Sequence, residues 1–149
     1  MKKPLILNNL GEVVTFLDRI ESNPDIPVSG DWDAFQNLSH CALTMEFTLE
    51  GYPLMHSKLF RVTVGKLAFH YFDWRGYMQH DTSEPTKGTK PFPPNGTLAG
   101  IQRLRKAINA FDAWQGKLQP HEAFGSLTKN QYAHFHSMHI ANHLEQFQF

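Results

Sequence analysis

Apolar side chains recur three and four residues apart in two segments near the start of the chain, which is the spacing of an amphipathic helix. The first stripe begins after Asn9 and ends at Asn23-Pro24, and the second begins after Asp33 and ends at Gly51. Each start has a capping box, because Glu or Gln follows the cap residue by three positions. We therefore predict two helices here. The stripes consist of Leu10, Val13, Leu17 and Ile20 in the first helix and Phe35, Leu38, Ala42, Met45 and Leu49 in the second.

Two further helical segments follow in the second half of the chain. In the third, Thr97 is the candidate cap, and the stripe runs from Leu98 to Phe111 before the segment ends near Gly116. In the fourth, Thr128 has a glutamine three positions later, and the helix runs close to the C-terminus. Four amphipathic helices with little strand signal between them predict an all-α four-helix bundle.

The connection between helices two and three, over residues 51–96, is much longer than a usual bundle loop. Residues 57–78 are rich in apolar and aromatic side chains, which predicts one or two short helices, although the β-branched run 62–64 leaves a strand open. Residues 81–96 are rich in proline and glycine, so we expect an irregular loop that could border a pocket.

Composition narrows the class of protein. A length of 149 residues with 41% hydrophobic residues fits one domain over 1–149, and equal numbers of basic and acidic residues, 14 of each, disfavour a nucleic-acid partner. The N-terminus has no apolar run that suits a signal peptide or a membrane span, so we expect a cytoplasmic protein without a membrane partner. The one cysteine, Cys41, cannot form an intramolecular disulfide, and a buried, inert thiol is favoured.

Histidines gather on the predicted fourth helix. At about 100° per residue, His139 and His143 share one face with His136, whereas His134 lies on a polar far side and is expected at the surface. Two imidazoles four residues apart can reach one metal ion. A metalloprotease helix would have a glutamate directly after the first histidine, and Ile140 stands there, so that class is excluded.

A zinc site needs at least three protein ligands, so a third ligand must come from elsewhere. His40, in the middle of helix two, is the best candidate. The alternative is that these histidines only pack and form hydrogen bonds. Gln36 and His136 either orient ligands or pack, and His121 either reaches the mouth of the site or lies in a solvated loop.

Two distant parts of the sequence carry a family resemblance. Trp32 opens a helix that continues with Gln36 and His40, and residues 121–147 read HEAFGSLTKNQYAHFHSMHIANHLEQF. The chain resembles the DinB/YfiT-like superfamily of metal-dependent four-helix-bundle proteins, and within it an uncharacterised branch. The resemblance implies a long crossover between helices two and three. It also implies a metal held by His40, His139 and His143, while Asn142 replaces a histidine that many relatives have before the last ligand.

Three histidines suit zinc, nickel, iron or copper, and we expect zinc or nickel. The resemblance implies metal-assisted thiol transfer on a small-molecule substrate, because characterised relatives in the superfamily use low-molecular-weight thiols. The rival hypothesis is a non-catalytic binding or dimerisation module. Aromatic residues, 13% of the chain, would supply the interface of such a homodimer.

Overall fold

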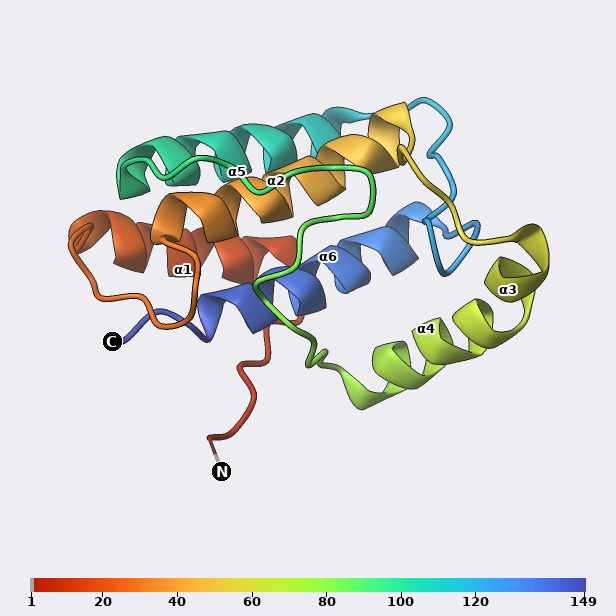
Figure 1. Ribbon diagram of the computed structural model, residues 1–149, viewed down its shortest axis with the longest axis horizontal. Coiled ribbons are helices and arrows are strands. Elements are labelled where there is room, and N and C mark those ends of the chain that lie inside the picture. Colours follow the sequence, from red (N-terminus) through yellow and green to blue (C-terminus); the bar gives the residue numbers. More distant parts are fainter. Residues whose placement is uncertain (1) are drawn as a thin grey trace.

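The computed structural model describes residues 2–149, and within this range the secondary structure is helical apart from two isolated bridges (Figure 1). The predicted all-α bundle is confirmed. Its four long helices are α1 (Leu10–Ser22), α2 (Ala34–Glu50), α5 (Thr97–Ala113) and α6 (Lys129–Leu144). The crossover between α2 and α5 carries two short helices, α3 (Lys58–Val62) and α4 (Val64–Arg75), so the β-branched run forms no strand.

The caps at the helix starts match the sequence pattern at α2 and α6, where both capping boxes are complete. At α1 the Asn9 side chain accepts from the Glu12 backbone, but the Glu12 carboxylate accepts from the backbone of Asn8 instead of Asn9. The expected cap at Thr97 is wrong. Gly96 is the N-cap of α5, with an extended backbone, and Thr97 is the first helical residue.

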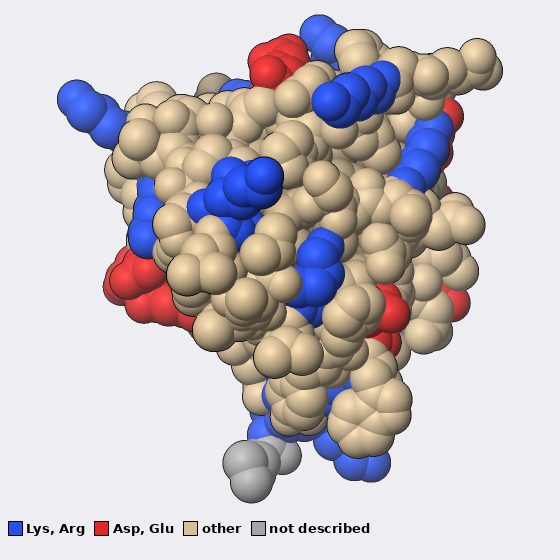
Figure 2. Space-filling model, turned by 90° about the vertical axis from the view of Figure 1, so that its right-hand side faces the viewer, with Lys and Arg blue, Asp and Glu red and all other residues tan. Residues whose placement is uncertain are grey.

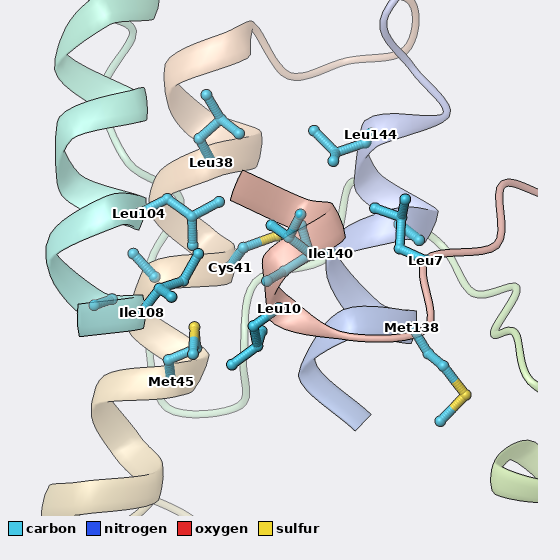
Figure 3. Close-up of a cluster of buried hydrophobic side chains, with 14 of the residues drawn as sticks. Leu7, Leu10, Leu38, Cys41, Met45, Leu104, Ile108, Met138, Ile140 and Leu144 are labelled. Carbon is cyan, nitrogen blue, oxygen red and sulfur yellow. The ribbon is translucent and has the colours of Figure 1, made fainter. Parts of the chain in front are cut away.

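The apolar core lies where the four long helices meet (Figure 3). Helix α2 packs most closely on α5, where a Cβ added to Gly100 would come within 3.1 Å of the Phe35 Cα atom. Cys41 points into this core and is fully buried, and burial raises the pKa of its thiol. The expected burial of this thiol is therefore confirmed, and a buried thiol with a raised pKa is a poor nucleophile.

From Phe135 to Leu144, helix α6 is buried around its whole circumference, and only its first turn keeps the predicted solvated side, at Asn130. Ser137 has no exposed surface, and its hydroxyl donates to the Ala133 carbonyl. His134 is half-buried, and its Nδ1 lies 2.6 Å from a carboxylate oxygen of Asp73 in α4. The crossover helix α4 thus covers the side of α6 that the sequence pattern left to solvent.

The connection over residues 114–128 is packed closely against α4. Gly65 lies in α4, and a Cβ at this position would stand 1.7 Å from the carbonyl oxygen of Ala123. The Lys66 ammonium also donates to the Ser126 carbonyl, at 2.6 Å. Glycine at position 65 therefore lets the helix and the connection touch, and this contact fixes where residues 121–125 lie.

Figure 2 shows the end of the molecule at which α3 lies, where lysine and arginine side chains stand apart from one another. No continuous basic surface covers this face. Among residues 2–149, no helix combines the length and the apolar character that crossing a bilayer requires.

We predict that Gly65→Ala lowers the free energy of unfolding by about 2 kcal/mol or more, because the added methyl group overlaps a backbone carbonyl that cannot move without its turn. Gly96→Ala is the control, since a Cβ there meets no atom within 4 Å and the exchange of this N-cap residue costs only about 1 kcal/mol or less. Urea denaturation of both variants measures the difference. Equal midpoints for the two variants would contradict the close contact.

Candidate metal centre

Helices α2 and α6 bring His40, His139 and His143 together, as the sequence predicted. One ring nitrogen from each of the three lies within 4.8 Å of the other two. The Nε2 atoms of His40 and His139 are 3.3 Å apart. All three side chains are buried, with exposed fractions of 7%, 6% and 0%. Three buried histidines at this spacing could bind one metal ion.

The spacing between His40 and His139 can be tested against zinc geometry. Two nitrogens on a tetrahedral zinc, each about 2.0–2.1 Å from the ion, are separated by about 3.3–3.4 Å. The observed 3.3 Å between the two Nε2 atoms agrees with this value. The same distance also fits a direct hydrogen bond in which one of the two rings donates.

The hydrogen-bond partner of His143 decides which of its nitrogens carries the proton. The amide nitrogen of Asn37 donates to the backbone carbonyls of Trp32 and Asp33, at 3.2 and 3.0 Å, so its oxygen faces the His143 ring. That oxygen accepts from Nδ1 of His143, at 2.8 Å. In a neutral ring, Nε2 therefore has a free lone pair. It is buried and has no hydrogen-bond partner among residues 2–149.

Burial keeps the cluster neutral. It lowers the pKa of His40 to about 4, with a smaller contribution from the nearby His80. Burial also lowers the pKa of His139 and His143 well below the usual value, and the neighbouring imidazoles add to the effect because two positive charges so close together repel. Neutral imidazole is the form that binds metal ions, so the cluster is in the ligating state at neutral pH.

His80 joins this site from the crossover, and sequence reasoning missed it. Its ring stacks on His139, with centroids 5.0 Å apart, and meets His143 edge-on at 5.3 Å. Asn142 holds it in place, because the amide accepts from the His80 backbone nitrogen at 3.3 Å and donates to its carbonyl at 3.4 Å. Asn142 thus anchors the crossover beside the cluster.

His136 and Gln36 form hydrogen bonds outside the cluster of His40, His139 and His143. Nε2 of His136 pairs with the Thr48 hydroxyl, at 2.9 Å, which ties α6 to α2. Gln36 completes the capping box of α2, and its amide nitrogen donates to the Phe92 carbonyl at 2.7 Å. Gln36 therefore fixes the far end of the crossover to the bundle.

His121 lies in a tight turn, and the expectation of a solvated loop is wrong. Residues 121–125 form an isolated bridge in which the backbones of His121 and Gly125 exchange two hydrogen bonds, at 2.9 and 3.1 Å. The turn packs its histidine between aromatic rings, and only 6% of the residue is exposed. No periodic pattern in the sequence marks such a turn, so the burial of His121 follows from the tertiary fold.

A cavity of about 300 Å³ adjoins the histidine cluster, which is the size of a small-molecule site. His40 and His139 line one part of it, and His121 lines another. The proline-rich loop contributes Glu84 to Lys87, so the expectation that this loop borders a pocket is confirmed. The cluster is therefore reachable by a ligand larger than water.

Buried neutral histidines predict a stability that falls in acid. The pKa of His121 and of His136 is lowered to about 3, mainly by burial. In the unfolded chain the pKa is about 6.5, so between about pH 6.5 and pH 3 the unfolded state binds more protons and acid favours unfolding. In metal-free protein, a change from pH 7 to pH 5 therefore lowers the free energy of unfolding by about 2 kcal/mol for each of these two histidines.

Urea denaturation in the presence of a chelator at the two pH values measures this loss. His121→Asn keeps an acceptor for the turn and reduces the loss by about 2 kcal/mol, because one titrating group is gone. His70→Asn, at an exposed position, leaves the loss unchanged. A His121→Asn variant that loses as much stability in acid as the parent would contradict the prediction.

Comparison with curated proteins and with solved structures found no match. A family model, however, matches residues 1–148, almost the whole chain. The chain therefore belongs to the family described as "Protein of unknown function (DUF1569)".

Proposed function

We propose that His40, His139 and His143 hold one divalent metal ion, and that the protein is a metal-dependent enzyme acting on a small molecule in the adjoining cavity. The observation that carries the proposal is the buried Nε2 of His143, which has a lone pair and no partner within residues 2–149. An unpaired buried acceptor costs stability, and an ion bound by this nitrogen together with His40 and His139 would remove that cost.

The ligand set favours zinc or nickel. Three neutral imidazoles suit both ions, and no thiolate joins them, because Cys41 points into the core. Three protein ligands leave a coordination position for water or substrate, as in catalytic zinc sites. Because His40 and His139 both line the cavity, we infer that this position opens toward it.

The reaction class we favour is transfer to or from a low-molecular-weight thiol. The likeness to the DinB/YfiT-like superfamily supports it, and a metal ion in this site would bind a thiol as its thiolate. The chain's own residues supply positioning: Asn37 fixes the His143 ring and Asn142 holds the crossover over the cluster. The aromatic walls of the cavity, which include Phe135, limit the access of water.

A homodimer is a second candidate, favoured by one observation. Leu59 of α3 and Leu67 and Trp74 of α4 expose 73%, 71% and 82% of their surface. Exposed apolar residues of this size often mark interfaces between copies of a chain. A dimer is compatible with an enzyme, but it would be the main function if no metal binds.

We predict about one metal ion per chain in untagged protein, measured by mass spectrometry after dialysis. His40→Ala and His143→Ala each lose the ion, because two remaining histidines do not hold it. His134→Ala is the control on the same helix, outside the cluster, and it keeps the ion. Folded protein that takes up neither zinc nor nickel would refute the metal site. Sedimentation of the same samples would then test the dimer.

We also predict that Asn37→Ala weakens metal binding about 10- to 100-fold, because Asn37 sets the proton position and the orientation of His143. Thr48→Val is the matched control, since it breaks the hydrogen bond between α2 and His136 and leaves the cluster intact. Competition with a chromogenic chelator measures both affinities. Equal losses in the two variants would show that Asn37 acts only through general stability.

A further inference from the structure

We propose that His121 and Glu122 form a recognition subsite for a neutral amide group of the substrate, in the same cavity as the histidine cluster. The proposal rests on the proposed function, in which the metal holds another part of that substrate. Phe135 connects the two regions, because its ring stacks on His139 at 5.7 Å and meets His121 edge-on at 4.8 Å. The subsite thus lies one aromatic ring away from the cluster.

His121 offers the cavity a hydrogen-bond donor in a fixed position. Its Nδ1 accepts from the backbone nitrogens of Ala123 and Phe124, both at 3.1 Å. The proton of the neutral ring is therefore on Nε2. Nε2 has no hydrogen-bond partner among the described residues, and the side chain lines the cavity. A carbonyl oxygen of a bound molecule would accept from this N–H group.

Glu122 offers an acceptor in the same cavity. It also lines the cavity, and its Oε2 atom is buried with no hydrogen-bond partner within residues 2–149. Burial raises the pKa of this carboxyl group, which the nearby Lys87 partly opposes. A buried acceptor without a partner destabilises the fold, and a turn of the carboxyl group would let a donor on a ligand in the cavity satisfy it.

The charges near Glu122 bear on which donor group of a bound molecule fits there. Lys87 lines the same cavity, and its ammonium lies 3.5 Å from Nε2 of His56. This ammonium offsets part of the negative charge of Glu122, so a cationic amine gains less beside it than it would beside an isolated carboxylate. A neutral N–H group does not depend on that charge. Together, a donor on His121 and an acceptor on Glu122 match the carbonyl and the N–H of an amide.

The turn that carries both side chains is rigid. The two backbone hydrogen bonds between His121 and Gly125 close it, and Gly125 has a positive φ of 72° that favours glycine. Gly65 of α4 presses against its middle. A preorganised donor and acceptor bind without an ordering cost, which is the property of a recognition site.

The subsite is tested by NMR on the protein as purified, with labelled histidine rings, using N-methylacetamide as the probe. Methyl acetate, which lacks the N–H group, is the matched control. We expect the amide to shift the His121 ring signals in a saturable way, at about tenfold lower concentration than the ester. This comparison does not depend on the metal. An equal response to both probes, or none at His121, would overturn the proposal.

Variants separate recognition from stability. Glu122→Met removes the preference for the amide, whereas Glu84→Met, an exposed acidic residue at the same cavity, keeps it. Because the Glu122 carboxyl oxygen is unpaired, Glu122→Met also leaves the urea midpoint unchanged or raises it. A lowered midpoint with the preference retained would assign Glu122 a structural role and overturn the subsite.

A separate titration tests whether one molecule can occupy the metal site and the subsite together. Cobalt-substituted protein is titrated with N-acetylcysteamine, which has a thiol and an amide, and with 2-mercaptoethyl acetate, its ester counterpart. The thiolate-to-cobalt absorption band measures the affinity for each compound. Tighter binding of the amide compound would support a substrate that spans both regions, whereas equal affinities would contradict it. If neither compound produces the band, thiol binding in the proposed function fails, while the NMR comparison still decides the subsite.

Discussion

Helix α2 has to be buried on two faces, and the second face is polar. One face packs into the apolar core against α5, while Asn37, His40 and Thr48 face α6. Buried polar groups need partners, and each of these three has a histidine of α6 opposite it. This set of side-chain pairs fixes the position of α6 along α2. The histidine cluster, the cavity and the place of the crossover all depend on that alignment.

The crossover completes the site because polar side chains of the bundle hold it at two points. The Gln36 amide donates a hydrogen bond to the Phe92 carbonyl, and the Asn142 amide forms two hydrogen bonds with the backbone of His80. Between these points lies the crossover's share of the cavity wall, which includes Glu84 and Lys87. The site is therefore built from segments far apart in the sequence, and its shape is set by hydrogen bonds to backbone groups that no side-chain pattern reveals.

The difference between local spacing and contacts between distant segments explains what the sequence could predict. Helix starts and the pairing of His139 with His143 depend on local spacing, so Asp33, Thr128 and the two histidines are recognisable from the sequence alone. His80 and His121 lie in segments without a period, and tertiary contacts place them. The burial of Ser137 is hidden for the same reason, because the covering helix α4 comes from another part of the chain.

The position of Cys41 bears on the chemistry of any thiol that enters the cavity. The only sulfhydryl group of the chain is enclosed among leucine, isoleucine and methionine side chains of the core (Figure 3). It has no contact with solvent, so it cannot form a mixed disulfide with a small molecule in the cavity. A thiol in the cavity would therefore meet no competing thiol from the protein, and oxidants would reach that thiol before they reached Cys41.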